Sequence, residues 1–196
     1  KGTDLPYLTH LLDVCSIAMR HGADEDQAIA ALLHDVVEDG GGSPMLDEIR
    51  SRFGERVADI VLTCSDSLEV DRSSKPPWWQ RKIDYIDHLR VASTDVALVS
   101  GADKLSNVRS IVADLEVDGD AVFDKFRTGR VGTLWYYRRI AEILPSRLPD
   151  TPRAKRLGNS LRAGVDQLVA AVADADADWV EALAAEEEAR ASMSGQ

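Results

Sequence analysis

Apolar residues recur along most of this chain with the spacing of one face of an α-helix. Between residues 5 and 20 the apolar side chains fall three and four positions apart, and the pair His21-Gly22 ends the pattern. No segment alternates apolar and polar residues with the period of two that is typical of a strand, and no internal repeat is present. The pattern predicts an all-α protein.

Capping residues divide the pattern into further helices. Asp24 followed by Gln27 forms a capping-box pair, which predicts the start of a helix that we expect to end at Gly40-Gly41-Gly42. Ser43-Pro44 has the chemistry of a new helix start, with Gly54 as its end. A polar stretch without periodicity predicts a loop over 67–75. Further helices are expected at 57–64, 76–86, 95–115 and 133–144.

The last quarter of the chain differs in composition from the rest. Residues 1–150 are expected to form one domain, since 196 residues with 44% hydrophobic content can bury one good core. Residues 151–196 are rich in alanine and acidic residues, which predicts an extension of one or two amphipathic helices. Its last part, from Ala184 to Gln196, is expected to be frayed or disordered.

Charge and apolar content exclude several classes of protein. The formal charge of −11 argues against binding to nucleic-acid polymers or anionic membranes, because both depend on clustered positive charge. The sequence has no run of about 18 apolar residues and no basic leader followed by an apolar segment. Cys15 and Cys64 lie in helix-like apolar patterns, which indicates reduced thiols. Together these features predict a cytoplasmic protein.

One part of this acidic chain is locally basic. Arg81 and Lys82 lie in a stretch from Arg72 to Arg90 where basic residues outnumber acidic ones. Such a patch attracts a small anionic substrate or is simply the solvated face of a helix, and the residues alone leave both interpretations open. For the neighbouring pair Trp78-Trp79, packing in a core or lid is favoured over stacking on a base.

The stretch from Ala31 to Gly40 concentrates chemistry in a helical pattern. At about 100° per residue, one sector of the predicted helix holds a histidine and three carboxylates: His34, Asp35, Glu38 and Asp39. Leu32 and Val36 are predicted on the opposite, packed side. Neighbouring carboxylates repel each other unless a cation neutralises them, and nitrogen and oxygen ligands of this kind suit Mn, Fe, Co or Zn. The alternative is a solvated acidic face near a helix end.

His10 shares a side of its predicted helix with Val14 and Ile17, so it is expected to point inward. A lone inward histidine is most often a core residue with a satisfied hydrogen bond. It becomes a metal ligand if His34 and Asp35 lie opposite. A second helix, over 95–115, also carries a polar face, with Asp103, Asn107 and Ser110 together.

These segments, in this order, resemble the HD-domain metal-dependent phosphohydrolases, whose ligand order is H…HD…D. Three longer segments of the chain resemble the hydrolase domain of the RelA/SpoT homologues, and most of all the short, stand-alone small alarmone hydrolases. They are Ala-Leu-Leu-His-Asp-Val-Val-Glu-Asp at 31–39, Arg-Phe-Gly-Glu-Arg-Val-Ala-Asp-Ile-Val at 52–61 and Ala-Asp-Lys-Leu-Ser-Asn-Val-Arg at 102–109. The resemblance runs from about Lys1 to Ile143 and implies an HD-domain helical bundle.

The resemblance also implies a metal and a catalytic pair. It implies one divalent ion, typically Mn²⁺, with Fe, Co, Zn or Mg as alternatives, and it assigns the ligands as His10, His34, Asp35 and Asp103. In that family the glutamate–aspartate pair, here Glu38 and Asp39, acts on the metal-bound water, and Glu38 is the favoured base. The chemistry is consistent, because a metal lowers the pKa of bound water and a nearby carboxylate takes the proton.

Substrate contacts follow from the same resemblance. It places Lys104, Asn107 and Arg109 where the family holds phosphate and sugar, and Tyr136 or Tyr137 where a tyrosine lines the pocket. Lys1 matches the end of a basic segment that flanks the purine, and the family helix before it is absent from this sequence. Arg81 and Lys82 correspond loosely to a basic region beside the pocket.

The function implied is hydrolysis of guanosine 3′,5′-bis(diphosphate), ppGpp, or of pppGpp to GDP or GTP and pyrophosphate. Two alternatives remain open. The same site could serve a phosphatase that acts on another nucleotide, such as the 2′-phosphate of NADPH or a nucleoside monophosphate. It could also serve a sensor that binds metal or alarmone without turnover. In each case the partner is a small anionic nucleotide, and the protein is expected to be a monomer or a homodimer.

Overall fold

The computed structural model describes residues 6–65 and 75–194, with the side chains of residues 39 and 40 left undescribed. The described ranges are helical and contain no strand, which confirms the all-α prediction. The α-helices are α1 (Leu8–Arg20), α2 (Glu25–Leu33), α3 (Gly42–Phe53), α4 (Glu55–Cys64), α5 (Trp78–Leu89), α6 (Thr94–Asp118), α7 (Gly129–Ile143), α8 (Pro152–Ala170) and α9 (Ala175–Ser194).

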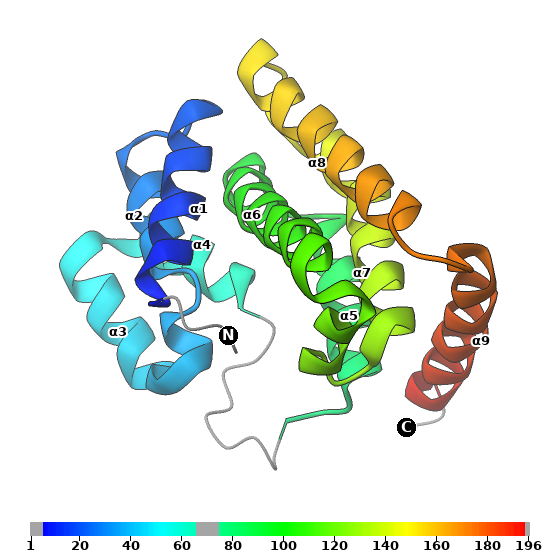
Figure 1. Ribbon diagram of the computed structural model, residues 1–196. Coiled ribbons are helices and arrows are strands. Elements are labelled where there is room, and N and C mark those ends of the chain that lie inside the picture. The colour runs from blue at the N-terminus through cyan, green and yellow to red at the C-terminus, as the bar shows by residue number, and fades with distance from the viewer. Residues whose placement is uncertain (1–5, 66–74, 195–196) are drawn as a thin grey trace.

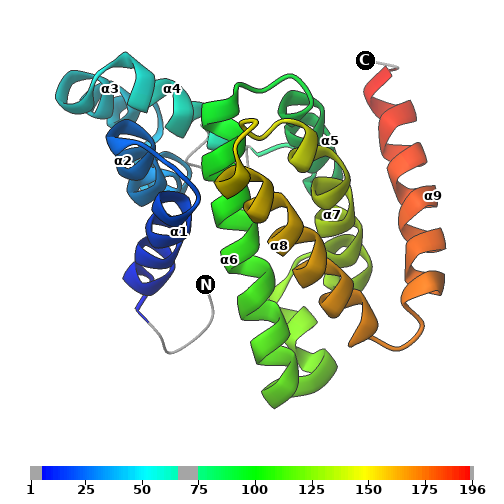
Figure 2. The same cartoon turned by 90° about the horizontal axis from the view of Figure 1, so that it is seen from above.

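The helices form two groups on either side of α6. Helices α1 to α4 lie together on one side, α5, α7 and α8 lie on the other, and α9 runs along the outer edge (Figures 1 and 2). Helix α6 contacts α1, α2 and α4 in the first group and α8 and α7 in the second. Side chains from both groups of helices can therefore come into contact with residues of α6.

The sequence of α6 explains its central place. The helix begins at Ser93, whose side chain accepts a hydrogen bond from the backbone N–H of Val96. Its buried residues point in several directions instead of forming one stripe, as expected for a helix packed on more than one side. Gly101 lets α8 approach closely, because a Cβ atom there would lie 2.7 Å from Leu144 and 3.1 Å from Leu157.

Helix boundaries agree with the capping signals in most places. Asp24 and Gln27 form the expected capping box, with each side chain bonded to the backbone of the other residue. Gly54 separates α3 from α4 with a φ of 90°, a left-handed value that glycine adopts without strain. Helix α3 starts at Gly42, slightly before the predicted Ser43-Pro44.

The prediction of one continuous helix from Asp24 to Gly40 is wrong. Helix α2 ends at Leu33, His34 and Asp35 form a turn, and a short π-helical turn spans Val37–Gly41. The His34 Nδ1 atom lies 2.9 Å from the carbonyl oxygen of Ala31, the group that would accept from the Asp35 N–H in an unbroken α-helix. The predicted division of this helix into a polar sector and a packed side is therefore not observed. Leu32, predicted on the packed side, is 36% exposed, whereas His34, predicted on the polar sector, is 2% exposed.

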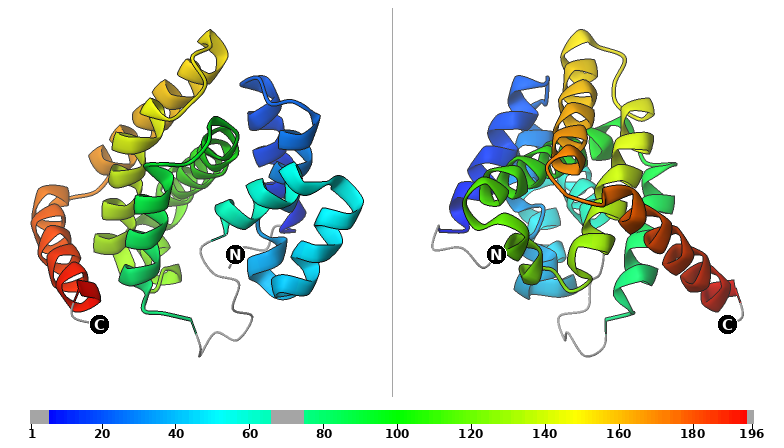
Figure 3. Two further views of the ribbon diagram at one scale, coloured as in Figure 1. Left: turned by 180° about the vertical axis from the view of Figure 1, so that it is seen from behind. Right: turned by 45° about the vertical axis from the view of Figure 1, so that its right-hand side comes forward.

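The C-terminal helices belong to the packed part of the molecule. Leu157, Leu161 and Leu168 of α8 are fully buried in the core cluster that also holds the buried residues of α6 and α7. The expectation of fraying from Ala184 is wrong, because α9 continues to Ser194. Figure 3 shows α9 beside α7 and α5 along the edge of the molecule. None of the helices in the described ranges combines the length and apolarity needed to cross a membrane.

Candidate metal centre

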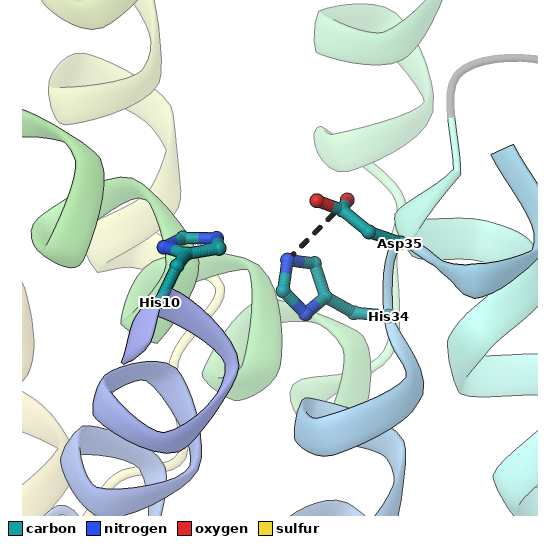
Figure 4. A group of neighbouring side chains, drawn as sticks. All are labelled: His10, His34 and Asp35. Carbon is teal, nitrogen blue, oxygen red and sulfur yellow. Dashed lines mark ion pairs between the residues drawn. The ribbon is translucent and has the colours of Figure 1, made fainter. Parts of the chain in front are cut away.

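Two histidines and a carboxylate meet where α1 faces the end of α2. His10 comes from α1, and His34 and Asp35 come from the turn after α2 (Figure 4). One ligand atom from each of the three lies within 4.8 Å of the others. The two imidazole rings lie edge to face, with centroids 5.3 Å apart. The spacing is that of side chains able to share one ion.

Asp103 adds a second carboxylate from α6. Its Oδ1 atom lies 3.4 Å from Nε2 of His10 and 3.6 Å from Nε2 of His34. Asp103 is buried, at 6% exposure. The structure therefore brings all four predicted ligand residues together, although they come from three separate segments of the chain.

The orientation of His34 makes one of its nitrogen atoms available as a ligand. Nδ1 faces the Ala31 carbonyl, which can only accept, so Nδ1 carries the ring hydrogen and a neutral ring has a bare lone pair on Nε2. Nε2 is buried and has no hydrogen-bond partner in the described residues; its nearest carboxylate oxygen, from Asp35, is 3.3 Å away. A lone pair that faces carboxylates is satisfied by a cation, so this donor set fits a divalent metal.

Tyr7, which was not among the predicted site residues, supports the same centre. Its hydroxyl donates a hydrogen bond to Oδ2 of Asp35, and its ring lies against His10 with centroids 5.6 Å apart. The available signal was spacing: Tyr7 precedes His10 by three residues, so the two lie one turn apart on the same face.

Lys104 sets the electrostatics beside the ligands. Burial alone would raise the pKa of the Asp103 carboxyl, but the adjacent Lys104 ammonium holds that pKa well below its usual range. Burial would likewise lower the pKa of Lys104, and the Asp103 carboxylate instead raises it well above its usual value. Both groups are therefore charged at neutral pH.

Aromatic rings surround the Lys104 ammonium. Its Nζ atom lies 5.2 Å from the ring centroid of Tyr85 and 5.6 Å from that of Tyr136, distances typical of cation–π contacts. Lys82 Nζ lies 5.0 Å above the Tyr136 ring. Tyr137 packs against Tyr136 with centroids 5.4 Å apart, and burial raises the pKa of its hydroxyl. The result is a cationic and aromatic surface next to the ligands.

The Tyr136 hydroxyl is buried and has no hydrogen-bond partner among the described residues. Asn107, also predicted, donates from Nδ2 to Oδ1 of Asp103. The structure thus brings Lys82, Lys104, Asn107 and both tyrosines to this region.

The remaining predicted substrate residues are Arg109, Arg81 and Lys1. Arg109 is exposed on α6, and the Nε atom of Arg81 donates to the carbonyl of Pro76 at 3.2 Å. Lys1 lies outside the described residues.

Of the predicted catalytic pair, Glu38 and Asp39, the structure describes the side chain of Glu38 alone. Glu38 is half-buried, and its Oε1 atom lies 3.6 Å from the ammonium of Lys75. The side chain of Asp39 lies outside the described part of the structure. The Lys75–Glu38 ion pair was not predicted, because the two residues are far apart in the sequence and helical periodicity relates only residues within one helix.

Two predictions about non-catalytic residues are confirmed. Trp78 and Trp79 pack against the core, and their rings contact Trp135 with centroids 6.0 and 4.7 Å apart. Cys15 and Cys64 are free, and burial raises the pKa of the Cys64 thiol to about 12.

Comparison with known proteins identifies relatives of this chain. A family model described as "HD domain" matches residues 1–134. The guanosine-3′,5′-bis(diphosphate) 3′-pyrophosphohydrolase MESH1 of Xenopus tropicalis is 36% identical over 108 residues, which cover 54% of this chain and 56% of that protein. The guanosine-3′,5′-bis(diphosphate) 3′-pyrophosphohydrolase of Aquifex aeolicus is 33% identical over 113 residues, 57% of this chain and 15% of that protein. The match to MESH1 thus spans little more than half of that relative's length.

Solved structures share the fold. A crystal structure of the protein lmo0812 from Listeria monocytogenes has a TM-score of 0.68 at 28% identity and covers 81% of this chain and 97% of that one. A protein described as a metazoan ortholog of SpoT that hydrolyzes ppGpp has a TM-score of 0.63 at 24% identity, with 85% and 84% covered. At that identity the second likeness shows the fold alone. The resemblance expected from the motifs is confirmed.

Proposed function

Because this chain belongs to the HD domain family, we propose that it is a metal-dependent phosphohydrolase that removes the 3′-pyrophosphate from ppGpp and pppGpp. The supporting observation is the buried Nε2 atom of His34, which has no hydrogen-bond partner among the described residues and faces the carboxylates of Asp35 and Asp103. The curated relatives named as 3′-pyrophosphohydrolases of this nucleotide support the choice of substrate.

His10, His34, Asp35 and Asp103 are the proposed ligands of one divalent ion. Mn²⁺ is the proposed ion because the family that the motifs resemble typically uses it, and the mixed imidazole and carboxylate ligands suit Fe, Co or Zn as well. Such an ion supplies Lewis acidity and lowers the pKa of water bound to it. The free cysteines support the cytoplasm as the compartment.

Glu38 is the proposed general base, and Asp39 the proposed assisting carboxylate. One carboxylate oxygen of Glu38 takes a proton as the water oxygen attacks the phosphorus bonded to the 3′ oxygen. The bond between that phosphorus and the 3′ oxygen breaks, the 3′ oxygen leaves as a hydroxyl after receiving a proton, and pyrophosphate is released. The Lys75 ammonium, 3.6 Å from Oε1 of Glu38, helps to hold this carboxylate in place.

The cationic and aromatic surface beside the ligands is the proposed place of the phosphates. Lys104 and Lys82 bring positive charge over the Tyr136 ring, and the Tyr136 hydroxyl is a buried donor without a partner in the described residues. Phosphate oxygens accept from both kinds of donor. Asn107, Tyr137, Arg109, Arg81 and Lys1 remain proposed substrate contacts.

The test is chromatography of products after the purified chain is incubated with Mn²⁺ and either ppGpp or NADPH. The proposal expects GDP and pyrophosphate from ppGpp, little change in NADPH, and loss of product with a chelator or in Glu38→Gln. Glu116→Gln, an exposed glutamate on α6, is the matched control and should keep full activity. Release of phosphate from NADPH alone would overturn the substrate assignment. Binding of ppGpp without product in the metal-loaded protein would instead indicate a sensor.

A further inference from the structure

A buried serine connects one candidate metal ligand to a carboxylate on the surface. Ser106 Oγ lies 2.6 Å from Oδ2 of Asp13 and 3.3 Å from Nδ1 of His10. Ser106 is 6% exposed and lies on α6, three residues after Asp103, whereas Asp13 and His10 both lie on α1. The contact therefore spans the packed boundary between α1 and α6.

The chemistry of the three groups fixes where the hydrogens lie. A carboxylate can only accept, so the single hydroxyl hydrogen of Ser106 points to Asp13, at a distance typical of a charge-assisted bond. The serine oxygen then offers a lone pair toward His10, and Nδ1 of His10 must carry a hydrogen to donate to it. In a neutral ring this leaves Nε2 as the bare nitrogen.

That assignment directs Nε2 of His10 toward the other ligands. It lies 3.4 Å from Oδ1 of Asp103. His34 is held in the same Nδ1–H tautomer without an intervening side chain, because the Ala31 carbonyl accepts directly from its Nδ1 atom. The two histidines thus use different partners to present the same ring nitrogen.

We propose that Asp13 and Ser106 are positioning residues that hold His10 in its Nδ1–H tautomer and fix its ring, and thereby set the affinity of the site for its metal. This inference rests on the proposed metal site and is independent of which nucleotide is hydrolysed. Partners of this kind behind a histidine ligand change metal affinity by about 10- to 100-fold when they are removed.

The first experiment measures Mn²⁺ affinity by calorimetry on the metal-stripped full chain, with no nucleotide present. Ser106→Ala and Asp13→Ala should each weaken binding by about 10-fold or more. Ser110→Ala removes an exposed hydroxyl one turn further along α6 and should leave the affinity unchanged. Ser106→Thr, which keeps the hydroxyl, should restore most of the affinity.

The double variant separates this mechanism from simple loss of charge. If Asp13 acts through Ser106, then Asp13→Ala has no further effect once Ser106 is alanine. If Asp13 only attracts the cation through space, the two effects add, and the inference fails. Wild-type protein that bound no Mn²⁺ would overturn the metal site itself. Unchanged affinity in Ser106→Ala would overturn this inference alone.

The second experiment reads the tautomer directly. Nitrogen-15 NMR of the metal-free protein, at a pH where the imidazole is neutral, distinguishes Nδ1–H from Nε2–H, and the signals of His10 are those missing in His10→Gln. Wild-type protein should show the Nδ1–H form, and Ser106→Ala should move His10 toward Nε2–H. The same tautomer in both proteins would contradict the proposal, whatever the activity of the enzyme.

Discussion

Replacing Glu186 by alanine should destabilise the protein strongly, although this residue lies in the acidic helix α9. Its Oε2 atom accepts hydrogen bonds from Nε1 of Trp135 at 2.8 Å and from Nη2 of Arg139 at 2.8 Å. Its Oε1 atom accepts from Nε of Arg190 at 3.1 Å, and Arg190 also reaches Asp87 on α5. One carboxylate thus joins α9 to α7 and, through Arg190, to α5.

The magnitude follows from how buried each partner is. Trp135 is fully buried, so its indole N–H would be left without an acceptor, at a cost of about 1–3 kcal/mol. The Arg139 side chain is 23% exposed and the Arg190 side chain 40% exposed, so water replaces part of what they lose. We expect a total of about 3 kcal/mol, or a fall of about 6–12 °C in Tm for a chain of this size.

Thermal and urea unfolding followed by circular dichroism would measure the effect. Glu187→Ala is the matched control, because it removes an exposed carboxylate from the next position of the same helix. A loss of less than about 0.5 kcal/mol in both variants would refute the reasoning. It would mean that α9 does not depend on the buried carboxylate.

The pH dependence gives a second check. Burial would raise the pKa of Glu186, but the hydrogen bonds from Trp135, Arg139 and Arg190 outweigh it and lower that pKa. A folded-state pKa below the unfolded one contributes stability at pH values above the unfolded pKa of about 4.3, and this contribution is lost as the pH falls through the folded value. The stability difference between wild type and Glu186→Gln should therefore narrow as the pH falls below the unfolded pKa of about 4.3.

Two further variants test the metal centre and the packing of α8. Tyr7→Phe removes the hydroxyl that donates to Asp35, so Mn²⁺ should bind several-fold more weakly by calorimetry while Tm in the absence of metal changes little; equal affinities would contradict the role given to Tyr7. Gly101→Ala places a Cβ 3.1 Å from the fully buried Leu157 of α8 and should cost about 1–3 kcal/mol in urea unfolding; a cost below that of an exposed Ser110→Ala would show that α6 and α8 are not in such close contact.

The helices and the candidate ligand residues could be predicted from the sequence because their signals are local or follow a fixed order. Helical periodicity and capping residues are local signals, and the metal motif places chemically distinctive residues in a fixed order. His10, His34, Asp35 and Asp103 could therefore be named before their distances were known, and the structure brings them together.

The local path of the chain near His34 could not be predicted in this way. Periodicity extends a helix through any residue that fits the pattern, but it cannot detect that a side chain competes for a backbone carbonyl. Here Nδ1 of His34 bonds the Ala31 carbonyl where α2 ends. The π-helical turn that follows carries Glu38, so the position of this proposed base relative to the proposed ligands differs from that on an ideal helix.

Contacts between distant segments were also missed. The alanine-rich, acidic composition after Ala184 is typical of a solvated helix, and nothing local reveals that Trp135 and Arg139 supply donors for Glu186. Ser106 and Asp13 likewise meet only because α1 packs on α6. Such pairs depend on the tertiary fold, which periodicity does not specify.

The most direct test of the central claim is the rate of GDP and pyrophosphate release from ppGpp as Mn²⁺ is returned to metal-stripped protein. We predict no release without metal, a rate that saturates near one equivalent of Mn²⁺ in wild type, and no recovery in His34→Gln. Release that does not depend on Mn²⁺, or ppGpp that stays intact while Mn²⁺ is bound, would contradict a metal-dependent hydrolase built on these four side chains.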